Sequence, residues 1–119
     1  MNTMTIIVDS LKVHAPIGVL LQEQKVGNDF EVTLMIDYAV DSCATDGDEL
    51  PGTLNYAELI ALVKEVMNTP SKLLEHVVAQ IADRIISKWS HVTGGSVKVV
   101  KITPPIACEV DGVGVMYKW

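Results

Sequence analysis

Residues 30–40 read Phe-Glu-Val-Thr-Leu-Met-Ile-Asp-Tyr-Ala-Val, the clearest strand pattern of this chain. Side chains alternate between the two faces of a strand, so one face carries Phe30, Val32, Leu34, Ile36 and Tyr38. The opposite face carries the more polar residues between them. One apolar face and one polar face are typical of a half-buried strand in an antiparallel sheet.

Further strands are predicted on both sides of this segment, at residues 3–15, 96–103 and 112–119. The first alternates imperfectly, and we expect it to bend near Asp9-Ser10. Gly94-Gly95 is predicted to be the turn that leads into the third strand. Residues 17–29 form a connection whose middle, residues 20–25, favours a helical turn.

Two helices are predicted after a loop at residues 41–53. Asn55 is the expected N-cap of the first, Glu58 would complete a capping box, and residues 68–70 end the helix. The second is expected over residues 71–89. The order ββααββ predicts an α+β fold: a four-stranded antiparallel sheet with both helices on one face. At 119 residues, we expect a single domain, residues 1–119.

Composition narrows the class of function. A formal net charge of −6 argues against nucleic acid as a partner, because such binding depends on Lys and Arg neutralising phosphates. No apolar run approaches the ~20 residues that span a membrane. The N-terminus shows no basic segment followed by an apolar one, so no secretory signal is predicted. With only two cysteines, we expect a reduced, cytoplasmic protein.

No metal or cofactor is expected from the motifs. His14, His76 and His91 are scattered, whereas a catalytic zinc usually takes three protein ligands. Cys43 and Cys108 have neither metal-ligand spacing nor the signature of a catalytic thiol. The chain also has no glycine-rich phosphate loop.

One short stretch has the features of a ligand site. Leu73-Leu74-Glu75-His76 follows Pro70 and Ser71 at the start of the second predicted helix. It places a carboxylate near free N–H groups and the positive end of the helix dipole, beside leucines that we expect to be buried. Such a carboxylate can hold a flat polar heterocycle by its donor edge. It can equally do no more than stabilise the helix start.

Three other polar residues are ordinary when taken singly. A lysine that ends an apolar strand, as Lys101 does, usually extends its ammonium group to water, and only burial would lower its pKa enough for it to act as a base. Glu23 lies in a predicted loop and Tyr56 at a predicted helix start. Position alone favours a structural role for each.

Considered together, these segments resemble the dihydroneopterin aldolase family of folate biosynthesis over essentially the whole chain. Four stretches carry the resemblance: residues 18–23 with Gly27 and Phe30, Asp46 with residues 53–56, residues 73–76 with Ile81-Ala82, and Lys101 with residues 103–106 and 111–115. Each is weak by itself. Four in the right order with compatible spacing are specific.

The resemblance implies a tunnelling fold assembled into rings, commonly octamers of two stacked tetramers, with active sites between subunits. In this family the glutamate that matches Glu75 anchors the pterin, and the leucine that matches Leu74 offers backbone contacts. The lysine that matches Lys101 is the general acid and base. The glutamate that matches Glu23 helps to bind and organise the site. The tyrosine that matches Tyr56 comes from a neighbouring subunit and takes part in proton transfer.

Two departures from the family pattern bear on substrate preference. Ile17 precedes Gly18 where many members have histidine, and Gly52 precedes Thr53 where many have aspartate. The expected reaction is a metal-free retro-aldol cleavage of 7,8-dihydroneopterin. An epimerase acting on dihydroneopterin or its triphosphate and a non-catalytic pterin-binding ring remain as alternatives. Nine Lys and Arg residues with a net charge of −6 disfavour the triphosphate.

Overall fold

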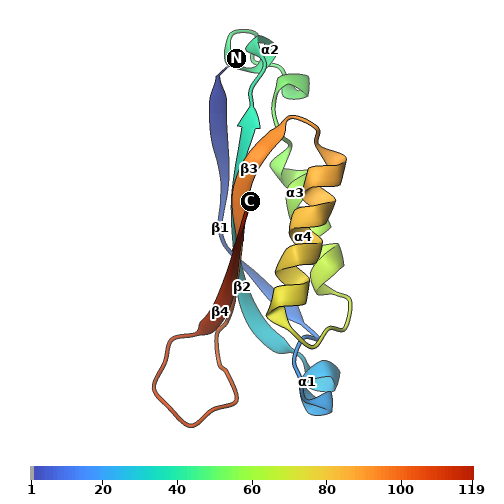
Figure 1. Ribbon diagram of the computed structural model, residues 1–119, viewed down its shortest axis with the longest axis vertical. Coiled ribbons are helices and arrows are strands. Elements are labelled where there is room, and N and C mark those ends of the chain that lie inside the picture. The colour runs from blue at the N-terminus through green and yellow to red at the C-terminus, as the bar shows by residue number, and fades with distance from the viewer. Residues whose placement is uncertain (1) are drawn as a thin grey trace.

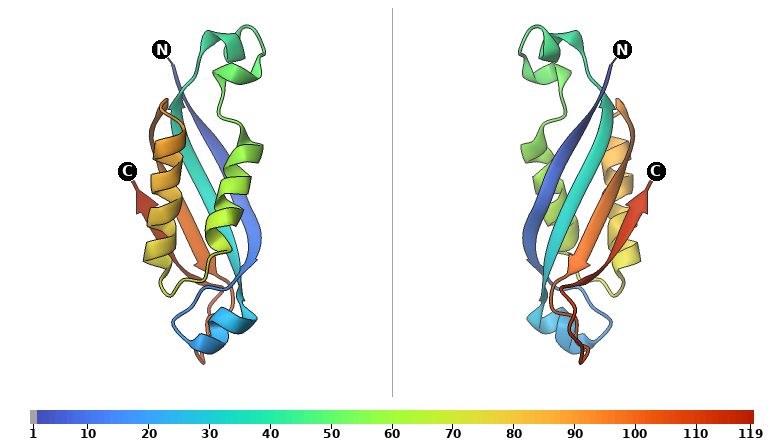
Figure 2. Two further views of the ribbon diagram at one scale, coloured as in Figure 1. Left: turned by 90° about the vertical axis from the view of Figure 1, so that its right-hand side faces the viewer. Right: turned by 90° about the vertical axis from the view of Figure 1, so that its left-hand side faces the viewer.

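Four antiparallel strands form one sheet in the order β1-β2-β3-β4 in the computed structural model, which describes residues 2–119. The strands are β1 (Thr3–Ala15), β2 (Asn28–Ala39), β3 (Val92–Lys101) and β4 (Val113–Lys118). The two long helices, α3 (Tyr56–Met67) and α4 (Leu74–Lys88), cover one face of the sheet (Figures 1 and 2). The predicted α+β class and the ββααββ order of the main elements are therefore confirmed.

The core lies between that face and the two helices. The five apolar residues of β2 predicted to share a face are all buried, and the most exposed of them, Tyr38, is only 6% exposed. Opposite them lie the buried faces of the helices, formed by Leu59, Leu62, Val63, Val66 and Met67 of α3 and by Val77, Val78, Ile81, Ala82 and Ile85 of α4. Buried residues recur at every second position of β2 and about every 3.6 positions of the helices. Each element therefore has one apolar face, and these faces pack against one another.

The predicted bend of β1 is confirmed, but the predicted turn at Gly94-Gly95 is wrong. In β1, the pairing register with β2 shifts between Val8 and Leu11, and Ser10 has a φ of 53°. Gly94-Gly95 lies inside β3, which begins at Val92. A Cβ on Gly95 would lie 2.6 Å from the Met35 carbonyl oxygen, so the glycine permits close approach of β2.

Both helix starts differ in detail from the prediction. The Asn55 side chain caps α3 by accepting a hydrogen bond from the Ala57 N–H at 2.9 Å. Glu58 does not complete a capping box, since its carboxylate lies 3.7 Å from Lys88 Nζ. The second helix begins at Leu74 rather than at Ser71. Ser71 instead forms a parallel bridge with Ile17, which holds its backbone extended.

The connections contain short helices that the sequence did not resolve individually. The turn predicted at residues 20–25 is α1 (Leu21–Val26). The predicted loop at residues 41–53 contains α2 (Ser42–Thr45) and a 3₁₀ helix, η1 (Leu50–Gly52). Among residues 2–119, no helix combines the length and the apolar character that crossing a membrane requires.

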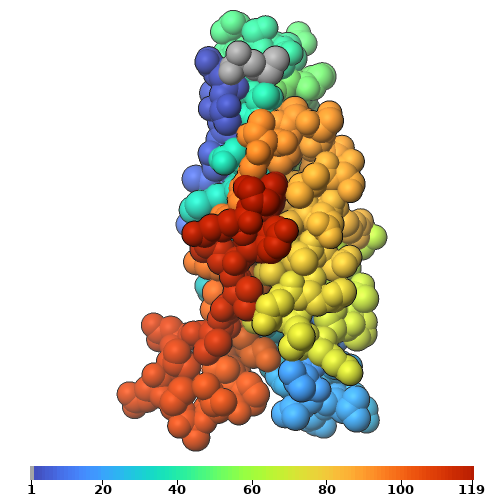
Figure 3. Space-filling view, viewed as in Figure 1, coloured from blue at the N-terminus to red at the C-terminus, as the bar shows by residue number. Residues whose placement is uncertain are grey.

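The ends of these elements determine which residues can meet. α1, the start of α4 and the end of β3 lie at one end of the elongated molecule, whereas α3 begins toward the opposite end (Figure 1). The loop between β3 and β4 and the segment containing α1 form separate lobes at the first end (Figure 3). The candidate site lies at this end.

Candidate functional site

The side chains of Lys101 and Glu23 form an ion pair where β3 ends beside α1. Lys101 Nζ lies 2.7 Å from Glu23 Oε2. The Lys101 side chain is 15% exposed and that of Glu23 10% exposed. A charge pair removed from water to this degree costs desolvation energy and is weak evidence for a stabilising role alone.

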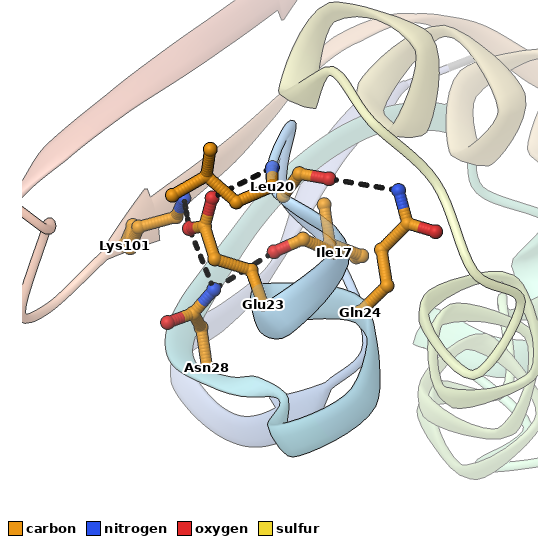
Figure 4. Close-up of polar contacts among 7 residues, drawn as sticks. Ile17, Leu20, Glu23, Gln24, Asn28 and Lys101 are labelled. Carbon is orange, nitrogen blue, oxygen red and sulfur yellow. Dashed lines mark hydrogen bonds and ion pairs between the residues drawn. The ribbon is translucent and has the colours of Figure 1, made fainter.

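Two hydrogen bonds besides that from Lys101 fix the Glu23 carboxylate (Figure 4). The Leu20 backbone N–H donates to Oε1 at 3.2 Å. The Asn28 side-chain amide donates to Oε2 at 3.0 Å and to the Ile17 carbonyl oxygen at 2.9 Å. Gly18 leaves the space that the carboxylate occupies, because a Cβ there would lie 2.5 Å from the Glu23 side chain.

These contacts keep Glu23 ionised. The hydrogen bond from Lys101 is the largest cause of a lowered pKa for Glu23, and the bonds from Leu20 and Asn28 act in the same direction against the effect of burial. Oε2 is shared between the Lys101 ammonium and the Asn28 amide. The lysine is thus held beside a carboxylate whose orientation is fixed from both sides.

The loop before α1 is joined to the start of α4 by backbone hydrogen bonds. The Gly18 N–H donates to the Ser71 carbonyl oxygen at 2.9 Å, and the Ser71 N–H donates to the Pro16 carbonyl oxygen at 3.3 Å. The side chain of Gln24 also donates to the Gly18 carbonyl oxygen at 3.0 Å. The Glu23–Lys101 pair and the Leu73-Leu74-Glu75 segment therefore belong to one end of the molecule.

Glu75 lies in the first turn of α4, as predicted, and is exposed. Within residues 2–119 its carboxylate makes no hydrogen bond or ion pair with another side chain. The expectation that its neighbouring leucines are buried is wrong: Leu73 is 51% exposed and Leu74 only partly buried. Both lie where α4 begins, at the rim of the core, so an apolar surface adjoins the carboxylate.

Tyr56 is the one predicted site residue that the fold keeps apart from the others. It begins α3 and is 65% exposed. α3 and α4 run in opposite directions, so the start of α3 lies far from the start of α4 (Figure 2). One copy of the chain cannot bring Tyr56 to the Lys101 pair.

Asn28 is the polar residue of this site that the sequence reasoning missed. The sequence indicates only that it belongs to the connection at residues 17–29, and in the structure it begins β2 at the turn that follows α1. Its amide lies beside that turn and bonds both Ile17 and Glu23. The signal available in the sequence was a side-chain amide at a turn close to Glu23, a predicted site residue. Among the described residues 2–119, no three His, Cys, Asp or Glu side chains are grouped so that they could hold a metal ion.

Comparison of the sequence with known proteins gives a consistent result. The family model for dihydroneopterin aldolase matches residues 6–118. The dihydroneopterin aldolase of Staphylococcus epidermidis is 34% identical over 113 residues, which cover 92% of this chain and 91% of the relative. That of Bacillus subtilis is 33% identical over 109 residues, with 91% and 90% covered.

Solved structures share the fold. A putative dihydroneopterin aldolase from Vibrio cholerae superposes with a TM-score of 0.84 at 24% identity, covering 100% of this chain and 98% of that one. The Escherichia coli dihydroneopterin aldolase in complex with neopterin gives 0.83 at 21% identity, covering 100% and 99%. On the sequence match across nearly its whole length, this chain belongs to the dihydroneopterin aldolase family.

Proposed function

We propose that this chain cleaves the side chain of 7,8-dihydroneopterin by a retro-aldol reaction. The products are 6-hydroxymethyl-7,8-dihydropterin and glycolaldehyde. The observation that carries the proposal is the Glu23–Lys101 pair, held largely out of water in a chain of this family. The E. coli relative in complex with neopterin supports a pterin as the ligand.

Glu75 is proposed to anchor the substrate. A carboxylate can accept two parallel hydrogen bonds from the amino and ring N–H groups of a pterin. Glu75 is exposed and unpaired within residues 2–119, and the partly exposed Leu73 and Leu74 flank it. The backbone at Leu74 lies at the start of α4, where N–H groups lack helical partners. Such an edge contact discriminates against molecules that lack the pterin donors.

Lys101 is proposed to move the protons of the reaction, and Glu23 to orient it. The 2′-hydroxyl proton leaves as the C1′–C2′ bond breaks, which releases glycolaldehyde. The bonding electrons pass into the C=N group of the ring, and the resulting enamine takes up a proton at C1′. The substrate is its own electron sink, so Lys101 needs no Schiff base. Proton transfer by positioned groups typically supplies about 10²–10⁴-fold.

The position of Tyr56 supports an assembly in which sites are shared between subunits. Tyr56 is exposed and begins α3, whose start lies toward the opposite end of the molecule from the end of β3, where Lys101 lies. β1 and β4 are the edges of the sheet, and paired edges protect a sheet from uncontrolled association. We infer a homo-oligomer, an octamer of two stacked tetramers, in which Tyr56 of one subunit completes the site of another.

The test is incubation of the purified protein with 7,8-dihydroneopterin in the presence of a chelator, with chromatography of the products. The Lys101→Ala variant should lose cleavage and keep pterin binding. Lys98→Ala is the matched control, since Lys98 lies three residues earlier on β3. Formation of only the C2′ epimer would favour an epimerase, and pterin binding without reaction would leave a binding ring.

A further inference from the structure

His14 bonds two acceptors on either side of the Gly27-Asn28 turn. Its Nδ1 lies 2.8 Å from Asp29 Oδ1 and its Nε2 lies 2.9 Å from the Val26 carbonyl oxygen. An ionised carboxylate and a carbonyl group can only accept, whereas a neutral imidazole has a single N–H. Both bonds therefore form together only when His14 is an imidazolium.

The turn that His14 spans holds both members of the Glu23–Lys101 pair. Asn28, within the turn, donates to Glu23 Oε2. The Gly27 N–H donates to the Glu23 carbonyl oxygen at 2.8 Å and closes α1. The Asp29 carbonyl oxygen accepts from the N–H of Ile102, the residue after Lys101, at 3.0 Å.

Gly27 fits the imidazole closely. Its φ is +82°, a conformation that favours glycine. A Cβ at this position would lie 2.5 Å from His14 Nε2. The turn therefore depends on glycine both for its backbone shape and for the approach of the histidine.

We propose that His14, as an imidazolium, is a positioning residue that holds Val26 and Asp29 together and so keeps Asn28 and Glu23 aligned with Lys101. The inference rests on the proposed function, in which Glu23 and Lys101 act on the substrate. Loss of the His14 proton removes one of the two bonds and loosens the turn. Turnover should then fall as pH rises.

The charges around His14 set the direction of this dependence. The hydrogen bond with Asp29, followed by that with the Val26 carbonyl, raises the pKa of His14 above its ordinary 6.5. Lys12 and Glu31 line the adjoining cavity on one side, and Lys64 of α3 lines another with His14. On α1, Glu23 is bound to Lys101 and Lys25 is exposed. A raised pKa means that both hydrogen bonds are fully formed below the ordinary value and are lost only as pH rises through the higher pKa of the folded protein.

The effect should be modest, because the His14 and Asp29 side chains are 61% and 71% exposed. Exposed ion pairs are screened by solvent, and their loss corresponds to about a two- to fivefold change in rate. The experiment compares kcat against pH for the wild-type protein, His14→Gln and Asp29→Asn. Glu31→Gln is the matched control, because it removes a nearby charge on β2 without touching either hydrogen bond.

NMR of protein labelled with ¹³C in histidine follows His14, whose signal is the one missing from His14→Gln. Asp29→Asn should lower the His14 titration midpoint and move the pH at which kcat falls by the same amount. His14→Gln should abolish that inflection and lower kcat about two- to fivefold at pH 6. In Glu31→Gln, the pH at which kcat falls should still follow the titration midpoint of His14.

A second readout does not depend on activity. The Glu23 carboxyl midpoint, followed by ¹³C NMR, should rise in His14→Gln as its bonds with Asn28 and Lys101 weaken. A kcat profile that stays fixed while the His14 midpoint moves would overturn the proposal. If the wild-type protein does not cleave the substrate, the proposed function fails. In that case an unchanged Glu23 midpoint rejects the His14 role, and a raised midpoint supports it.

Discussion

Lys101 Nζ and Glu23 Oε2 are 2.7 Å apart although 78 residues separate them in the chain. The contact forms because β3 ends beside α1. The loop before α1 is hydrogen-bonded in turn to Ser71, which lies shortly before α4. The ammonium and the carboxylate are therefore held by the sheet, a short helix and a loop together. Pairing holds the lysine beside the space where the substrate is proposed to react.

The Glu23–Lys101 pair should make the free energy of unfolding depend on pH in the acid range. The pKa of Glu23 is lowered in the folded protein, first by Lys101, so its contribution is present above the unfolded value near 4.5. That contribution is lost as pH falls through the lower folded pKa. Glu23→Gln should therefore flatten the decline of unfolding free energy below pH 4.5, measured by urea unfolding at a series of pH values.

Glu109→Gln is the control for this measurement, because Glu109 is an exposed acid in the loop between β3 and β4 and makes no ion pair within residues 2–119. It should leave the slope close to that of the wild-type protein. An equally steep decline in Glu23→Gln would show that other carboxylates account for the acid sensitivity.

Asn28 should matter to turnover more than to binding. Asn28→Ala removes the amide from Glu23 Oε2 and from the Ile17 carbonyl oxygen, leaving both partly buried acceptors short of a donor. A lost hydrogen bond to a charged group corresponds to about a 10- to 100-fold effect. We expect kcat to fall within that range while the dissociation constant for the pterin product changes little, as titration calorimetry would show.

Gln24→Ala is the matched control for Asn28→Ala. Gln24 also donates its amide within this loop, but to the Gly18 carbonyl oxygen and not to Glu23. The kcat of Gln24→Ala should fall less than that of Asn28→Ala. Equal losses in both variants would mean that general loop stability, rather than the bond to Glu23, sets the rate.

The pattern of β2 predicted the fold because every second residue had to be buried against the helices. The positions that sequence reasoning placed wrongly were decided by contacts between distant segments. Gly94-Gly95 reads as a turn locally, yet the neighbouring β2 backbone fits against Gly95 inside β3. Ser71 has a local pattern for a helix start, yet its bonds with Pro16 and Gly18 keep it extended.

Only part of the site could be predicted, because its contacts also join segments that are distant in the sequence. Taken singly, Glu23 and Lys101 gave no sign of a functional role. The family resemblance placed both in the active site, but their ion pair was not predicted. The role of Asn28 depends on a turn geometry that no periodicity encodes. His14, which seemed a scattered histidine, has two acceptors only because β1 places it opposite Asp29.

Glu75 should govern pterin binding with little effect on folding. Its carboxylate is exposed and unpaired within residues 2–119, so Glu75→Gln removes no internal contact. Loss of a charged hydrogen-bond acceptor should weaken binding of 6-hydroxymethyl-7,8-dihydropterin about 10- to 100-fold, measured by fluorescence titration. Asp83→Asn, an exposed acid on the same helix, is the control and should bind normally. Tight binding by Glu75→Gln would show that the pterin edge is held elsewhere.

Tyr56 and Lys101 should complement each other between subunits. Tyr56→Phe keeps the ring but loses the hydroxyl, and Lys101→Ala loses the ammonium, so each homo-oligomer should be strongly impaired. If Tyr56 of one subunit serves the Lys101 of another, oligomers reassembled from both variants contain some sites with both groups intact. Mixing followed by dissociation and refolding should therefore restore a fraction of wild-type cleavage, measured as glycolaldehyde release.

The control for this complementation is a mixture of Glu23→Gln and Lys101→Ala subunits. Glu23 and Lys101 pair within one chain, so no reassembled site can regain both from a single subunit. That mixture should remain as inactive as its parents. If the Tyr56→Phe and Lys101→Ala mixture also stays inactive although mass spectrometry shows mixed oligomers, the shared site is refuted. Tyr56 would then act, if at all, outside the chemistry of the Lys101 pair.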